Sequence, residues 1–453
     1  MKKNYLFGMA LMASLAFFSC TNEVIYVHDG ESSEQVSDEQ IITLQVSNGG
    51  DGLTTRAGRP LYSAEAKQTI QNVKVIVCNA SSVVYTKDFT KWNDSESPDS
   101  QEYTESGAHG RKTTIKLEGD DRLGKGRQYT VYAIGYHNNS DYKDKEGSNT
   151  LNALLSGIGV GDTFNENLTL KFTGSNNAEE IFAGSAELSI SDKGAGSANV
   201  VLNRQVAGAF VYLKDIPYYA DAEKIDLVAS TKNDQLILGK FANKDFTSNG
   251  SNSVDFSVIN GWNSEKSASG QADETVIASI TLSDWFTSID NNNGLIDVAK
   301  WKNKYAAQSP KPTFQKGSVF AGTFLIPFAR VANNQTLKLV MKNGSNRELA
   351  SWNINLSATG NNYTNLYTWN GSTFGESSAT ETLNKNSYSI VRNHLYGIGT
   401  RMEDDPGDGT DPEPTDPEKP DPDIDDPESL NNNQELTLRV NDNWEVIHGM
   451  ELE

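Results

Sequence analysis

The chain has 453 residues, enough for two or three domains that each bury a hydrophobic core. Its formal net charge of −21 at pH 7 argues against nucleic acid and anionic membrane surfaces as partners, because both require a basic footprint. Its only cysteines are Cys20 and Cys78, which excludes a disulfide scaffold and a CxxC metal or redox site.

The first twenty residues, MKKNYLFGMALMASLAFFSC, are typical of a secretory signal that ends at a lipidation cysteine. Two lysines precede an apolar run that is too short for a stable membrane span. We therefore predict a signal peptide over residues 1–19 and a precursor that carries acyl chains on Cys20. The alternative is ordinary secretion.

Residues 20–56 are predicted to be a propeptide that contains one strand, IITLQV. Alternation of apolar and polar residues defines the buried face of this strand: Ile42, Leu44 and Val46. The stretch that follows, SNGGDGLTTRAGRP, is rich in glycine and is the kind of exposed segment that proteases cut. A trypsin-like enzyme would cut between Arg56 and Ala57, whereas Arg59 precedes a proline and resists cleavage.

The region from about residue 61 to residue 401 has the pattern of a β protein. Short β-branched or aromatic runs are bounded by Gly, Asn, Asp and Ser. Two β-sandwich domains, over residues 57–217 and 218–401, fit this spacing because each strand can bury one face between two stacked sheets. ANVVLNRQVAGAFVYLKDIP is predicted to be the long last strand of the first domain, and LKLVMKNGSNRELASWNINL to be a hairpin.

Residues 402–430 are rich in proline and acid, which predicts an extended, semi-rigid tether. At roughly 3 Å per residue the tether could reach on the order of 80 Å, more than the width of a domain. It would hold the end of the chain away from everything before it.

The last segment, residues 431–453, is predicted to be a strand with one apolar face. That face contains Leu436, Leu438, Val440, Trp444, Val446, Met450 and Leu452. The polar run NDN divides the strand into two parts, as though each part docks on a different domain of an acceptor.

Residues 42–46, ITLQV, match residues 436–440, LTLRV, position by position. A match of five residues also occurs between unrelated strands, and that interpretation stays open. The alternative is that cleavage removes the first strand and leaves an open groove in a sheet. The last strand of a neighbouring molecule could then enter this groove by β-strand addition, and such a head-to-tail contact yields a filament.

Catalytic and metal-binding motifs are absent from the sequence. The five histidines are scattered, with no HExxH spacing, and no GxSxG, Walker or GxGxxG motif occurs in a strand–turn–helix setting. We predict that the protein is not an enzyme and that it has no metal site and no cofactor.

The chain resembles the fimbrillins of Bacteroidales, the major subunits of protease-assembled pili. The resemblance rests on the signal that ends at Cys20, TTRAG at Arg56, EIFAGSAELSI followed by VVLNRQVAGAFVYL, VRNHLYGIG before the tether, and the C-terminal extension. It implies two transthyretin-like Greek-key β-sandwich domains, export as an outer-membrane lipoprotein, and removal of the N-terminal strand by an arginine-specific protease. It also implies a homopolymer on the cell surface, in contact with anchor and tip fimbrial proteins.

A stalk subunit is the economical interpretation, because the chain has both a removable strand and a donor strand. The alternative is a monomeric surface lipoprotein that binds glycans or host protein, with the extension folded back on its own domains. Trp262, Trp285 or Trp301 would then form a sugar platform, although core packing is the more ordinary use of each.

Overall fold

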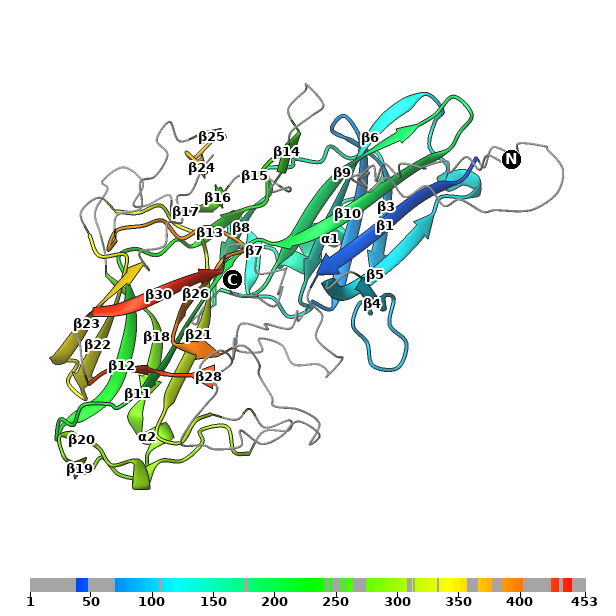
Figure 1. Ribbon diagram of the computed structural model, residues 1–453. Helices are drawn as coiled ribbons and strands as arrows, with labels where there is room; N and C mark the ends of the chain where they lie inside the picture. Colours follow the sequence, from blue (N-terminus) through cyan, green and yellow to red (C-terminus); the bar gives the residue numbers. More distant parts are fainter. Residues whose placement is uncertain are drawn as a thin grey trace, which may run out of the picture. The chain divides into compact units, whose positions relative to one another are not determined.

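The structure is a computed structural model, and its described part is all-β (Figure 1). It belongs to one compact unit of the chain. The described residues are 38–47, 70–105, 108–174, 178–239, 241, 244–246, 253–255, 257–263, 274–307, 312, 314–331, 334–356, 366–376, 385–401, 425–431 and 435–441.

An eight-stranded sheet occupies the N-terminal half, in the order β3-β2-β6-β9-β10-β1-β5-β4 (Figure 1). Every neighbouring pair is antiparallel except β1 and β10, which are parallel. The strands are β1 (Gln40–Ser47), β2 (Asn72–Asn79), β3 (Ser82–Phe89), β4 (Gln101–Glu105), β5 (Ala108–Lys116), β6 (Arg127–Tyr136), β9 (Phe182–Ile190) and β10 (Gly196–Arg204).

A nine-stranded sheet follows, in the order β18-β12-β22-β23-β30-β26-β11-β21, with β29 paired to β11. Three of its pairs are parallel: β23 with β30, β11 with β26, and β11 with β29. The strands are β11 (Ala207–Lys214), β12 (Ala222–Ala229), β18 (Thr275–Thr281), β21 (Val319–Leu325), β22 (Leu337–Asn343), β23 (Glu348–Leu356), β26 (Leu395–Ile398), β29 (Glu428–Ser429) and β30 (Glu435–Asn441).

Smaller elements complete the described fold. A four-stranded sheet has the order β17-β13-β8-β7, and the remaining strands form pairs or a sheet of three. These strands are β7 (Tyr142–Asp144), β8 (Thr169–Phe172), β13 (Gln235–Ile237), β14 (Lys244–Phe246), β15 (Ser253–Asp255), β16 (Ser257–Ile259), β17 (Gly261–Trp262), β19 (Asn291–Asn292), β20 (Leu295–Ile296), β24 (Leu366–Trp369), β25 (Phe374–Glu376), β27 (Thr400–Arg401) and β28 (Asp425–Asp426). The helices are α1 (Leu151–Ser156) and α2 (Leu282–Trp285), with 3₁₀ turns at Gly119–Asp121 and Val298–Lys300.

Strand β2 shows how the sequence builds two cores. Successive side chains of a strand point to opposite faces of its sheet. Val73, Val75 and Val77 therefore enter the core that β1 also lines, whereas Ile76 and Cys78 enter the larger core that includes the second sheet. The first sheet is buried on both faces at this strand, which accounts for its nearly continuous apolar sequence.

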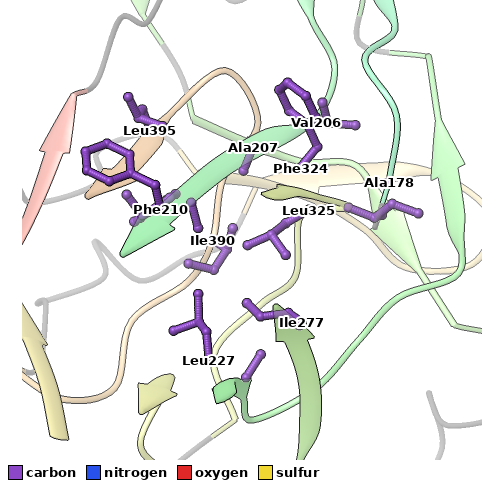
Figure 2. Packing of buried hydrophobic residues seen from close by; sticks show 14 of the residues in the cluster. Ala178, Val206, Ala207, Phe210, Leu227, Ile277, Phe324, Leu325, Ile390 and Leu395 are labelled. Carbon is purple, nitrogen blue, oxygen red and sulfur yellow. The ribbon is translucent and has the colours of Figure 1, made fainter. Parts of the chain in front are cut away.

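The larger core surrounds the start of β11. Figure 2 shows Val206, Ala207 and Phe210 with buried side chains from several other elements. Those side chains include Phe324 and Leu325 of β21 and Leu395 of β26. Residues far apart in the sequence thus share one apolar cluster.

The predicted hairpin is confirmed, since β22 and β23 pair with Leu339 opposite Trp352 and Met341 opposite Ala350. The prediction of one long strand that ends the first domain is wrong. The chain forms β10 in the first sheet, breaks at Gln205–Val206, and forms β11 in the second sheet. The break places buried Gln205 where its side chain bonds Ala183 of the first sheet and Arg392 in the segment before β26.

Candidate functional site: the two inserted strands

Strand β1 is an internal strand of the first sheet, although it comes from the N-terminal end of the described chain. Gln40–Val46 pair in parallel with Gly196–Leu202 of β10, and Ile41–Ser47 pair antiparallel with Lys116–Gly110 of β5. Without β1, the facing edges of β10 and β5 would have no partner between them. An unpaired sheet edge of this kind readily accepts another strand.

The apolar face of β1 is completely buried. Ile42, Leu44 and Val46 are each 0% exposed and belong to the same core as Val200 and Leu202 of β10. At roughly 1.5–3 kcal/mol for each side chain, this burial contributes about 5–9 kcal/mol gross. A strand that replaces β1 would need three apolar residues at the same alternate positions.

Gln40 fixes the start of β1 through its side-chain amide. Its Nε2 donates to the carbonyl oxygens of Leu123 at 3.1 Å and Gly194 at 3.0 Å, and its Oε1 accepts from the Leu123 amide at 2.8 Å. The residue is 2% exposed, so loss of the amide would remove three buried hydrogen bonds to the backbone of Leu123 and Gly194. Gln40 thereby helps to set the register of β1.

Three predicted site residues near the N-terminus lie outside the described residues. They are the lipidation site Cys20 and the cleavage pair Arg56 and Ala57. Their roles stay predictions. Removal of β1 also stays a prediction, although the strand and the burial of its three apolar residues are part of the described structure.

Strand β30 is inserted into the second sheet of its own chain. Glu435–Leu438 pair in parallel with Asn353–Leu356 of β23, and Arg439–Asn441 pair antiparallel with Gly397–Leu395 of β26. The expectation that the last strand lies away from a finished sheet is therefore wrong. The two halves of this sheet meet at β30, because it stands between β23 and β26.

Three of the seven apolar residues predicted for the donor strand lie in the described part of the chain. Leu436 and Leu438 are 2% and 1% exposed and belong to the larger core. The backbone of Val440 pairs with Tyr396. The other four predicted residues lie outside the described residues: Trp444, Val446, Met450 and Leu452.

The residues that flank the start of the predicted tether pair with residues near its end. Thr400 pairs with Asp426 and Arg401 pairs with Asp425, and Lys214 Nζ contacts Asp426 Oδ1 at 2.8 Å. Gly399, at φ +74, directly precedes this bridge, and a Cβ there would come within 2.6 Å of the Tyr212 carbonyl oxygen. Residues 402–424 lie outside the described residues, but their flanks do not carry the last strand away from its own chain.

The segment before β26 contains a half-buried histidine, His394. Nδ1 of His394 donates to the Arg392 carbonyl oxygen at 2.8 Å. Burial disfavours the charged imidazole and lowers the pKa of His394 to about 4. His394 is therefore neutral in the folded chain at neutral pH.

Of the three tryptophans proposed for a sugar platform, Trp285 is excluded by its burial. Trp285 is 0% exposed, and its ring lies edge-on to that of Phe314 with centroids 5.1 Å apart. Trp301 is half-buried, and its Nε1 donates to the Ser318 carbonyl oxygen at 2.6 Å. Trp262 is half-buried as well. A fully buried Trp285 cannot stack on a sugar.

The described residues contain neither a candidate metal site nor a membrane-spanning helix. Among them, no group of three or more His, Cys, Asp or Glu side chains is arranged to hold a metal ion. Within the same ranges, no helix has the length and apolar character needed to cross a membrane.

Comparisons with known proteins give structural likeness only. No protein-family model and no curated protein matches the chain. It is similar to a candidate cell adhesion protein from Bacteroides eggerthii, with 12% identity over 89% of this chain and 95% of that chain and a TM-score of 0.35. A candidate cell adhesion protein from Parabacteroides distasonis matches with 12% identity over 89% and 96% of the two chains and a TM-score of 0.34. The fimbrial anchor protein Mfa2 from Porphyromonas gingivalis matches with 11% identity over 77% and 100% and a TM-score of 0.32. Identities and TM-scores this low assign no family to the chain.

The internal match between residues 42–46 and 436–440 was the one sequence signal that related the two strands. It did not indicate that each strand occupies a slot in its own chain. Sequence inspection also missed Gln40, Gln205 and Arg392, because a buried polar side chain has no distinctive pattern in a sequence without its partners.

Proposed function

We propose that the chain is a structural stalk subunit of a cell-surface fimbrium, made as an outer-membrane lipoprotein. An arginine-specific protease cuts after Arg56 and removes β1, and the last strand of a neighbouring subunit fills the slot. The subunits form a homopolymer, with anchor and tip fimbrial proteins at its ends. Two transthyretin-like sandwich domains remain the fold that we propose for each subunit.

The observation that supports this proposal is that β1 and β30 have the same strand directions relative to their two neighbours. β1 lies parallel to β10 and antiparallel to β5, and β30 lies parallel to β23 and antiparallel to β26. Both strands place apolar residues at alternate buried positions: Ile42, Leu44 and Val46 in β1, and Leu436 and Leu438 in β30. A strand with the pattern of β30 therefore meets the requirements of the β1 slot.

Exchange requires β30 to leave its own sheet. Burial of Leu436 and Leu438 opposes this step by about 3–6 kcal/mol gross, and burial of an equivalent face in the neighbour's slot compensates for it. The net gain then comes from the filling of a slot that cleavage has emptied. An uncleaved chain has no such slot and should stay monomeric.

A second candidate function is a monomeric surface lipoprotein adhesin. The observation that favours it is the position of β30, which completes its own sheet as an extension folded back on its own domains would do. This candidate predicts that cleavage after Arg56 produces no polymer.

The test is a reversible lock on β30 in a Cys20→Ser background. Cysteines replace Asn353 and Glu435, which pair directly in the parallel register. After brief treatment with an arginine-specific protease, the reduced protein should form a ladder of oligomers on size exclusion, with chains that start at Ala57 by intact mass. The oxidised protein should stay monomeric.

The presence or absence of this ladder distinguishes the stalk subunit from the monomeric adhesin. A ladder from both the oxidised and the reduced protein shows that β30 is not the donor. A cleaved, reduced protein that stays monomeric favours the solitary adhesin.

A further inference from the structure

The buried side chain of Gln205 connects the neighbours of the two slots. Gln205 follows β10, the neighbour of β1, and Arg392 stands shortly before β26, the neighbour of β30. Gln205 Oε1 accepts a hydrogen bond from Arg392 Nη1 at 2.6 Å. Gln205 is 0% exposed and Arg392 is 1% exposed.

The other end of the same amide is bonded to the first sheet. Gln205 Nε2 donates to the carbonyl oxygens of Asn203 in β10 at 2.8 Å and Ala183 in β9 at 3.2 Å. Asn260, itself 0% exposed, donates through Nδ2 to the Gln205 carbonyl oxygen at 3.2 Å. One amide thus bonds the first sheet through its nitrogen and the segment before β26 through its oxygen.

Backbone hydrogen bonds continue the connection into the second sheet. The Asn393 amide donates to the Val206 carbonyl oxygen at 2.9 Å, and the Gly208 amide donates to the His394 carbonyl oxygen at 2.9 Å. From Gly208 and Leu395 onward, β11 and β26 form a parallel pair. Around this junction, Val206, Ala207 and Leu395 pack in the apolar cluster of Figure 2.

A junction of this composition resists independent movement of its two sides. A buried guanidinium requires hydrogen-bond acceptors, and a buried amide that loses its partners incurs the full desolvation penalty. If β10 shifts, Gln205 must either move Arg392 with it or break these bonds. The start of β26 is therefore fixed relative to the end of β10.

We propose that this junction couples the two slots, so that β1 in its slot stabilises β30 in its own sheet and removal of β1 loosens β30. This inference rests on the proposed function, since it takes β1 as the strand that is removed. β1 pairs with seven consecutive residues of β10, Gly196–Leu202. Loss of that pairing leaves β10 paired on one side only, with β9, so that it can shift at the junction, and the shift weakens the pairing of β26 with β30. Cleavage would then both empty the acceptor slot and release the donor strand.

Coupling between two sites is reciprocal and is typically worth a factor of 5 to 150. The test is hydrogen–deuterium exchange on the full, uncleaved Cys20→Ser chain, with Leu44→Ala as the change in the β1 slot. Exchange in the β30 peptide should become about 5- to 150-fold faster. Leu438→Ala should speed exchange in the β1 peptide by a similar factor.

Two further variants make the test specific. Val75→Ala removes an equally buried side chain from β2, which does not pair with β1 or β10, and it should leave β30 exchange nearly unchanged. Gln205→Met keeps the size of the side chain but removes both ends of the amide. In the Gln205→Met background, Leu44→Ala should no longer affect β30.

The inference is overturned if Leu44→Ala leaves β30 exchange unchanged, or if Val75→Ala accelerates it equally, because the effect would then be general destabilisation. The exchange rates of β30 in Leu44→Ala and Val75→Ala test the coupling even if Gln205→Met fails to fold. No step of this test requires cleavage or assembly. A chain that shows the coupling but forms no ladder after cleavage would overturn the proposed function and leave the inference standing.

Discussion

Leu438 of β30 lies opposite Leu356 of β23 in a parallel pair, and both side chains are buried in the second sheet of their own chain. The last strand is therefore part of the folded monomer. Any role for it in another molecule begins with its departure from this sheet.

The first prediction concerns the contribution of β30 to monomer stability. Leu438→Ala in the uncleaved chain should lower the free energy of unfolding by about 2–5 kcal/mol, because it removes a buried leucine side chain and leaves a cavity. Urea unfolding followed by tryptophan fluorescence measures the change. Val276→Ala is the control, since this valine is 43% exposed on β18 of the same sheet and should cost much less. Equal losses would contradict the placement of β30.

The second prediction concerns Gln40 at the start of β1. Gln40→Ala should lower the free energy of unfolding by about 1–3 kcal/mol, because the backbone groups of Leu123 and Gly194 lose their hydrogen bonds to the Gln40 amide. Gln45→Ala is the matched control. Its Nε2 donates to the Tyr103 hydroxyl at 2.6 Å, and this half-buried contact should cost less. A smaller loss for Gln40→Ala than for Gln45→Ala would refute the role given to Gln40.

The third prediction is a loss of stability in acid that depends on His394. Its pKa is about 4 in the folded chain and about 6.5 when unfolded, so the unfolded chain binds the extra proton first as pH falls. Stability is fully present above pH 6.5 and decreases down to pH 4, by about 3 kcal/mol from this residue.

The measurement for His394 is urea unfolding at several pH values between 7 and 4. Burial also lowers the pKa of His137, which acts in the same direction, so the comparison is between the wild type and His394→Gln. The variant should have a shallower pH dependence. Identical slopes would show that His394 does not titrate differently in the two states.

The fourth prediction concerns the buried ion pair of Arg204 and Glu180. Arg204 Nη2 lies 2.7 Å from Glu180 Oε1, with side chains 0% and 1% exposed. Glu180→Ala should cost about 3–5 kcal/mol of unfolding free energy, because the guanidinium stays buried without its carboxylate. Replacement of both residues by apolar side chains of similar size should cost less than the single change. Calorimetry of the two variants decides whether this order holds.

The fifth prediction concerns residues 402–424. Because Arg401 pairs with Asp425, replacement of these residues by a turn of about four residues should preserve the fold. The shorter loop should raise the free energy of unfolding by about 1–2 kcal/mol through loop-closure entropy. A large loss of stability would instead show that the acidic segment has contacts of its own with the fold.

The sequence by itself determined the class of the fold and the identity of its best strands. Apolar alternation in residues 42–46, 337–356 and 436–440 predicted strands that the structure contains, because a strand must place alternate residues on one face. The hairpin of β22 and β23 was also predicted, since a short turn joins two alternating runs, but the register shift between Met341 and Lys342 was not.

Tertiary structure alone decided where the strands insert. Local pattern shows that residues 436–440 form a strand with an apolar face, but it does not specify which sheet accepts that face. The position of β30 depends on an open slot between β23 and β26, whose residues are about 40 to 90 positions earlier in the chain. The Gln205–Arg392 contact joins residues 187 positions apart, and a buried polar pair is recognised only when the fold has brought donor and acceptor together.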